Sequence, residues 1–255
     1  MPFTPVESEK LSHAVVQQIE LLILRGILHP GERLPAEREL AERLGVSRPS
    51  LREALSDLEA HGLIRRRAGA GIYVADVLGP AFSEPLIRLF STHDEAVFDC
   101  IAFRRDIEGL AAERAAKLGS ETDHAVIGEI FRQMEEAHRR RSGNDESRLD
   151  AEFHMAIIEA GHNLVTLHMM RAMYALLQEG VFYNRKAMFR QRSTRDALLD
   201  QHRAIHDAIL KRSPEGARAA VERHLDFVEQ AMLDQRRTER NESIARQRLD
   251  HAART

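Results

Sequence analysis

The stretch LPAERELAERLGVSRPSLREAL, residues 34–55, decides the fold of the N-terminal part of this chain. Its leucines and alanines recur at helical spacing on both sides of its single glycine, which predicts two short helices joined by a tight turn. Ser47 stands where a helix N-cap belongs, and Pro49 falls in the first turn, where a missing N–H costs little. Arg48 and Arg52 then lie four residues apart on one face of the second helix. A helix-turn-helix presents guanidinium groups to a DNA major groove in this way.

A basic hairpin is predicted directly after the second helix. Residues 63–67 and 72–75 have the character of short strands around a glycine-rich segment, a pattern typical of a β-hairpin. Three consecutive arginines stand on the first strand, and Gly69 at the tip lets the backbone approach a groove or phosphate closely. An isolated pair of arginines is more often a solvated surface feature. The ordered set of turn, capped helix and basic hairpin favours a winged helix-turn-helix instead.

Composition limits the remaining possibilities. A length of 255 residues suits two modest domains, and 43% apolar residues are enough for packed cores. The net charge of −3 excludes a globally basic DNA coat, so DNA binding must use a local basic face. The single cysteine, Cys100, excludes an internal disulfide and fits a reducing cytosol. Because residues 1–10 lack an apolar signal core and no apolar run reaches transmembrane length, we expect a cytoplasmic protein without a membrane partner.

Beyond residue 76 no strand pattern is found. Apolar periodicity predicts helices near residues 86–91, 96–117, 122–141, 146–160, 163–188, 194–211 and 214–236. Short connections between such helices indicate an antiparallel bundle. We therefore expect a mainly α chain, with a winged helix-turn-helix at 1–76, a linker at 77–95, an all-helical domain at 96–236 and a charged tail at 237–255 that forms a solvated, fraying helix.

Four side chains in the predicted bundle have the chemistry of metal ligands. Asp150 and His154 are four residues apart and share a helix face, while His202 and His224 each lie in the apolar stripe of their own helix. Three neutral imidazoles and a carboxylate on inward faces would suit zinc or a similar divalent ion. Each residue alone is more often a hydrogen-bonded core side chain, and the chain holds 13 histidines. Spacing alone does not distinguish His202 from His206.

Residues 10–76 resemble the winged helix-turn-helix of the GntR family of bacterial transcription regulators. The segments PGERLPAERELAERLGVSRPSLREAL and GLIRRRAGAGIYV carry the likeness, although Ala70 replaces the central glycine of the commoner wing tip. The resemblance places DNA contacts on Arg38, Ser47, Arg48, Ser50, Arg52 and Gly69. It implies that Arg48 and Arg52 read or clamp the operator. Arg38 would hold a phosphate, and Gly69 would enter the minor groove.

Residues 95–232 resemble the FCD ligand-binding domain of the FadR subgroup of that family. LDAEFH matches its D-x-x-F-H signature, and QHRAIHDAI and VERHLDF match its two later histidine segments. The resemblance implies a divalent metal, zinc first and nickel or manganese as alternatives, on Asp150, His154, His202 and His224. It also places Arg104 in the same cavity, facing a small carboxylate effector. The alternative for Arg104 is an intrahelical pair with Glu108.

Over its whole length the chain is similar to regulators of pyruvate dehydrogenase, lactate and glycolate operons. LEAHGLIRRR, AFSEPLIRLFS and LDQHRAIHDAILKRSPEGARAAVERHL carry that likeness, and the pair Asp150 and His154 favours the metal-dependent glycolate and lactate sensors. The resemblance implies a homodimer on palindromic operator DNA that is controlled by a small 2-hydroxy or 2-oxo monocarboxylate. We expect the acid to relieve repression, with activation as the alternative. Two alternatives are a metal-dependent hydrolase or lyase of small acids, with Glu152 as base, and a repressor that senses the metal itself.

Overall fold

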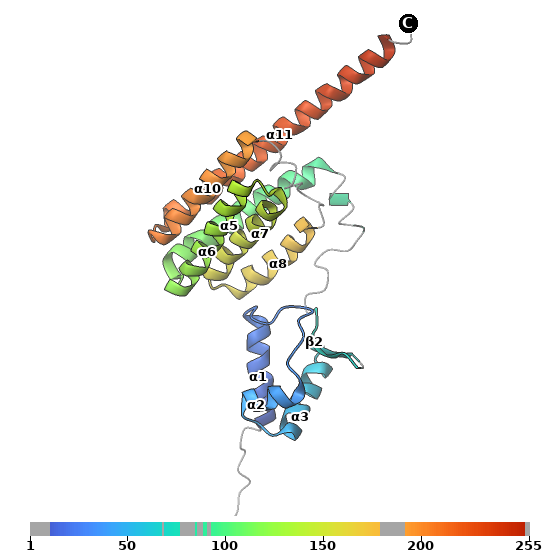
Figure 1. The fold of residues 1–255 in the computed structure, drawn as a ribbon, viewed down its shortest axis with the longest axis vertical. Coiled ribbons are helices and arrows are strands. Elements are labelled where there is room, and N and C mark those ends of the chain that lie inside the picture. Colours follow the sequence, from blue (N-terminus) through green and yellow to red (C-terminus); the bar gives the residue numbers. More distant parts are fainter. Residues whose placement is uncertain are drawn as a thin grey trace, which may run out of the picture. The chain divides into compact units, whose positions relative to one another are not determined.

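The structure is a computed structural model that describes residues 11–67, 69–76, 85, 89–90, 93–178 and 192–252. The chain divides into two compact units, Met1–Ala81 and Phe82–Thr255. The first unit contains the helices α1 (Leu11–Leu24), α2 (Glu37–Leu44) and α3 (Arg48–Ala60), followed by the strands β1 (Ile64–Arg67) and β2 (Gly71–Val74) (Figure 1). This is the predicted order of a winged helix-turn-helix, and the mainly helical fold class is confirmed.

The local signals around Gly45 act as the sequence predicts. Gly45 ends α2 in the left-handed region, with φ 66°, a conformation that glycine adopts without steric cost. Ser47 caps α3, because its hydroxyl accepts a hydrogen bond from the Ser50 amide at 3.3 Å. Leu51 and Leu55 on the inner face of α3 are fully buried in the core that α1 covers. Because this apolar stripe is buried, the opposite face of α3 is held toward the solvent.

The hairpin starts and ends one residue away from its predicted limits. The strands pair antiparallel, with Ile64 opposite Val74 and Arg67 opposite Gly71. Leu63 closes α3 through its amide, which donates to the carbonyl of Leu58, and is therefore not part of β1. Arg33 forms an isolated bridge to the other edge of β2.

The second unit is an all-helical bundle. It contains α5 (Asp94–Leu118), α6 (Glu121–Arg140), α7 (Gly143–Ala160), α8 (Leu164–Gln178), α10 (Arg192–Leu210) and α11 (Pro214–Ala252). Ser120 and Asp123 form a reciprocal capping box at the start of α6. The most extensive packing is between α5 and α11, between α6 and α7, and between α10 and α11. Most of the helix predicted at 86–91 and the end of that predicted at 163–188 lie outside the described residues.

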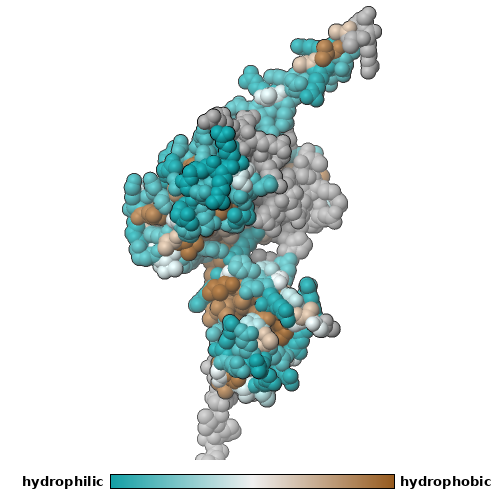
Figure 2. Space-filling view, viewed as in Figure 1, coloured by the Kyte–Doolittle hydropathy of each residue, from teal (hydrophilic) through white to brown (hydrophobic). Residues whose placement is uncertain are grey.

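The charged tail is helical, as expected, and it continues the last helix of the bundle. α11 continues without a break to Ala252, so the charged segment from residue 237 belongs to the same element. No glycine or proline interrupts that stretch, and pairs four residues apart, such as Arg246 with Glu242 at 2.9 Å, support it locally. Its projecting end is largely hydrophilic (Figure 2). Among the described helices, none is long and apolar enough to cross a membrane.

Candidate DNA-binding face and metal centre

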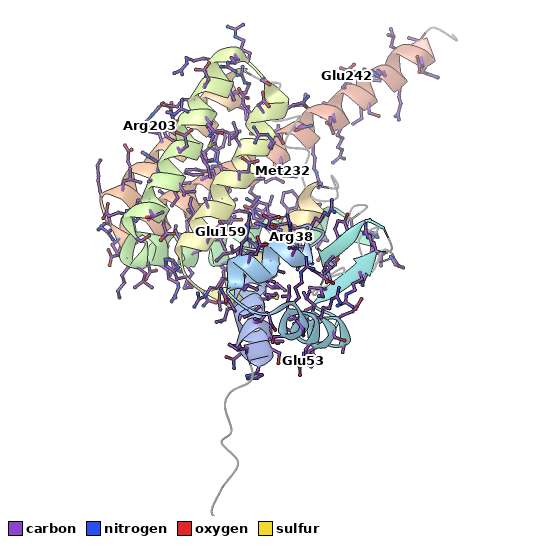
Figure 3. All side chains as sticks on the ribbon, turned by 60° about the horizontal axis from the view of Figure 1, so that its bottom comes forward. Arg38, Glu53, Glu159, Arg203, Met232 and Glu242 are labelled. Atoms are coloured by element: carbon purple, nitrogen blue, oxygen red, sulfur yellow. The ribbon has the colours of Figure 1, made fainter. Side chains whose placement is uncertain are left out.

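The exposed face of the helix-turn-helix carries the predicted arginines. Arg38 lies on α2 (Figure 3) with 76% of its side chain exposed, and Arg48 is exposed at the first position of α3. Arg52 is also exposed, but its Nε donates to Glu37 at 2.8 Å, so DNA must compete with that carboxylate. The hydroxyls of Ser47 and Ser50 lie 2.9 Å apart. Arg48 therefore starts α3 on a rigid cap.

Gly69 forms part of an open wing tip. Its φ is +71°, a left-handed conformation that side chains rarely adopt, and a Cβ placed on it would meet nothing within 4 Å. The tip is therefore accessible backbone, as the resemblance implied for entry into a minor groove. Behind it, the hydroxyl of Tyr73 donates to the carbonyl of Ala70 at 3.1 Å.

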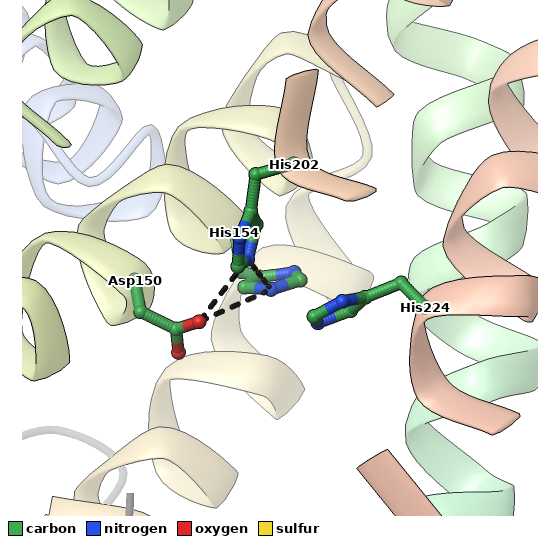
Figure 4. Close-up of side chains that lie close together, drawn as sticks. All are labelled: Asp150, His154, His202 and His224. Atoms are coloured by element: carbon green, nitrogen blue, oxygen red, sulfur yellow. Dashed lines mark hydrogen bonds and ion pairs between the residues drawn. The ribbon is translucent and has the colours of Figure 1, made fainter. Parts of the chain in front are cut away.

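The structure brings all four predicted metal ligands together in the bundle (Figure 4). One donor atom from each of Asp150, His154, His202 and His224 lies within 4.8 Å of every other, and all four side chains are buried. His202 Nε2 is 3.1 Å from the Asp150 carboxylate and 3.3 Å from His154 Nε2. Donor atoms around a tetrahedral zinc lie about 3.3–3.5 Å apart, given bonds of about 2.0–2.1 Å. Two of the distances in the cluster are close to this spacing, whereas His154 Nε2 lies 4.0 Å from the Asp150 carboxylate.

Hydrogen bonds orient two of the imidazoles for ligation. His154 Nδ1 lies 2.8 Å from Glu108, and His224 Nδ1 lies 3.0 Å from the amide oxygen of Gln201. A carboxylate and an amide oxygen only accept, so each Nδ1 carries its proton and each Nε2 keeps its lone pair. Burial lowers the pKa of His154 and lowers that of His224 well below its usual range. Both rings are therefore neutral at pH 7, which is the form that binds metals.

Arg104 is buried beside the cluster, and both interpretations of it have structural support. Its Nε donates to Glu108 at 2.6 Å, which is the intrahelical pair, and one Nη donates to the hydroxyl of Tyr174 at 3.2 Å. Burial opposes its charge, but Glu108, Tyr174 and Asp150 together raise its pKa well above the usual value. Burial likewise opposes the charge of Glu108, yet Arg104 and His154 hold the pKa of Glu108 well below its usual range.

Two other candidate residues on the same helices, His206 and Glu152, lie outside the cluster. His206 lies outside it, stacked on Phe131 at 4.6 Å between ring centres and bonded to Asp207. Glu152, the base of the enzyme alternative, is 45% exposed and pairs with Arg148 at 2.7 Å on the surface of α7. It therefore does not face the four ligands.

Three residues that support the site were not predicted in that role. They are Glu108 as partner of His154, together with Tyr174 and Gln201. The sequence pattern pairs Glu108 only with Arg104. The sequence offers no local signal for contacts between helices that are far apart along the chain.

A capped helix with exposed arginines and an open wing, joined in one chain to a helical bundle with a buried ligand set, is the architecture of a DNA-binding regulator with a second domain. Residues 11–74 match the gntR family of bacterial regulatory proteins, and residues 99–227 match the FCD domain. The chain therefore belongs to the GntR family of bacterial transcription regulators, in the subgroup with an FCD domain.

Similar proteins agree with this assignment. The Glc operon transcriptional activator of Escherichia coli strain K12 is 33% identical over 89% of this chain and 91% of its own length. An E. coli protein proposed as the L-lactate dehydrogenase operon regulator is 36% identical over 88% of this chain and 86% of its own. A solved Streptococcus agalactiae GntR structure has the same fold, with a TM-score of 0.53 and 23% identity over 86% of this chain and 99% of that one. The chain is thus a transcriptional regulator, and the enzyme alternative is set aside.

Proposed function

We propose that this regulator senses a small 2-hydroxy or 2-oxo monocarboxylate through a bound divalent metal ion. The preferred ion is zinc, and its ligands are Asp150, His154, His202 and His224. The observation that supports this proposal is the convergence of these side chains, with two imidazoles already oriented for ligation. Nickel and manganese remain alternatives, because imidazole and carboxylate suit both ions.

The charge of such a site favours an anion. A divalent ion and Arg104 bring three positive charges, while Asp150 and Glu108 bring two negative ones. The surplus is one positive charge in a buried place, and a monocarboxylate neutralises it. A 2-hydroxy or 2-oxo group offers a second oxygen next to the carboxylate, so the acid can bind a metal through two atoms. The E. coli relative proposed for the L-lactate dehydrogenase operon supports the same chemical class.

On the DNA side, the proposal is a homodimer that places two winged units on a palindromic operator. Arg48 and Arg52 contact base edges or clamp the backbone, Arg38 holds a phosphate, and Gly69 enters the minor groove. The acid changes operator affinity only by binding the DNA-competent and incompetent states differently. We expect binding of the acid to lower the affinity for the operator.

Calorimetric titration of glycolate, lactate and pyruvate tests the proposal on zinc-loaded, nickel-loaded, manganese-loaded and chelated protein. We expect acid binding to collapse after chelation and to be restored by one of the ions. Equal acid affinity in loaded and chelated protein would make the ion structural and move the effector site elsewhere. A change of DNA affinity with the metal alone, without any response to acids, would favour the metal-sensing repressor.

A further inference from the structure

One face of the wing gathers three arginines from two separate segments. In antiparallel pairing, residues directly opposite each other project to the same side of the sheet. Arg65 lies opposite Tyr73, and Arg67 lies opposite Gly71. Arg33, from the segment before α2, lies opposite Tyr73 on the other edge of β2. These five residues form what we call the outer wing face.

Contacts within this face hold its shape. The Arg67 guanidinium lies 4.7 Å from the centre of the Tyr73 ring. A Cβ on Gly71 would lie 2.9 Å from Arg33 Nε, so the Arg33 side chain rests against the glycine itself. Since the Tyr73 hydroxyl is bonded to Ala70 next to the tip, the arginines are arranged around a fixed ring.

No carboxylate among the described residues neutralises the charges of this face. Arg33, Arg65 and Arg67 are exposed, and none has a carboxylate within ion-pair distance in the described part of the chain. Arg66, on the opposite face of the same strand, differs. Its Nε lies 3.5 Å from Glu59, whose carboxylate also accepts from the Arg66 amide at 3.1 Å. Three clustered guanidinium groups without anions repel one another and favour an external anionic partner.

We propose that the outer wing face binds the DNA phosphate backbone beside the groove that the wing tip enters. This inference rests on the proposed DNA-binding function and adds Arg33, Arg65 and Arg67 to the six DNA contacts named above. Guanidinium groups bind phosphate oxygens through paired N–H donors, which gives affinity and register without reading sequence. Arg66 stays with Glu59 and makes no such contact.

The test is a salt titration of DNA binding with the full-length chain. The probes are a short duplex selected from a random pool by the wild-type protein, and a scrambled duplex of equal composition. Arg33→Gln and Arg65→Gln should each lower the slope of log affinity against log salt by about 0.9 on both duplexes. Between about 50 and 200 mM salt, this means a loss of affinity roughly 3–4-fold smaller than that of the wild type. Arg66→Gln, the matched control, should keep the wild-type slope.

A variant that keeps the positive charge at position 67 separates the effect of charge from the effect of side-chain shape. Arg67→Gln should reduce the slope, whereas Arg67→Lys should preserve most of it, and thermal unfolding of each variant checks that the fold is kept. Equal slopes for Arg65→Gln and Arg66→Gln would overturn this inference and leave the DNA-binding function intact. A loss confined to the selected duplex would also overturn it, because base reading would then be the cause. If the wild-type chain retains no duplex at all, the proposed function and this inference both fail.

Discussion

Replacing Glu108 with glutamine should weaken metal binding and destabilise the metal-free bundle. Glu108 is 2% exposed, and its carboxylate accepts from Arg104 Nε at 2.6 Å and from the Tyr174 hydroxyl at 3.0 Å. Its second oxygen lies 2.8 Å from His154 Nδ1. Glutamine keeps the size of the side chain but offers one accepting oxygen in place of two. Either Arg104 or His154 must therefore lose its partner.

The expected magnitudes follow from that loss. Removing one member of a buried ion pair typically costs about 3–5 kcal/mol of stability. We expect the lower end, about 3 kcal/mol, because Asp150 also raises the pKa of Arg104 and so compensates part of its charge. If glutamine instead turns its oxygen to Arg104, His154 loses the acceptor that orients it. Loss of such a support typically lowers metal affinity about 10–100-fold.

Two measurements separate the effects. Urea unfolding of chelated protein gives the stability change, and competition with a coloured chelator gives the metal affinity. Glu113→Gln is the matched control on α5, since Glu113 is 40% exposed and pairs with Arg218 at 3.3 Å; it should cost less than about 1 kcal/mol. Wild-type metal affinity together with wild-type stability in Glu108→Gln would refute the reasoning about this carboxylate.

Four further predictions follow from the same contacts. His202→Ala should empty the metal site, whereas His206→Ala should leave it filled; the measurement is the metal content per chain. The reverse result would mean that His206, and not His202, faces the site from α10. Arg104→Ala should weaken acid binding by about 1.5–3 kcal/mol and keep the metal, with incomplete rescue by lysine, whose ammonium lacks a planar fork. Calorimetry decides that case. Arg48→Ala should weaken binding to the selected duplex by about 1–3 kcal/mol in gel-shift titrations, and unchanged affinity would remove Arg48 from the recognition surface. Finally, burial lowers the pKa of His224 well below 6.5, so the unfolded chain binds a proton first as the pH falls. Urea titrations of chelated protein should show stability that declines below about pH 6.5 and is level above it.

The N-terminal fold was predictable because its signals are local. Gly45 permits the turn, Ser47 caps the next helix, and Pro49 fits only an early helical position. Each of these effects acts within a few residues along the chain, so no tertiary information is needed. The pairing of Arg33 with β2 is different, because it joins segments on either side of the helix-turn-helix and leaves no periodic trace.

The candidate metal site was predictable only in part. His202 and His206 are four residues apart, so they differ by about 40° around the helix axis and both fit an inward face. Packing against α11 and α6 sets the rotation of α10. From the sequence, the likeness to the FCD domain, and not the spacing, favours His202. The pair of Arg104 and Glu108 looked complete as an intrahelical contact. Only the tertiary structure brings Glu108 to His154, because their helices are distant along the chain.

The geometry of Arg104 also limits how much it can contribute to switching. Moving a two-state equilibrium from mostly bound to mostly free requires about 5.5 kcal/mol of differential ligand binding. Nε of Arg104 donates to Glu108, and its Nη2 donates to Glu108 and to the Tyr174 hydroxyl, so two of its five N–H groups, those of Nη1, are left for an acid. One hydrogen bond to a charged group contributes about 1.5–3 kcal/mol. If the acid controls operator binding fully, most of the remaining energy must come from its bond to the ion, whose ligands come from α7, α10 and α11. Chelation should therefore abolish the response to the acid, whereas Arg104→Ala should only reduce it.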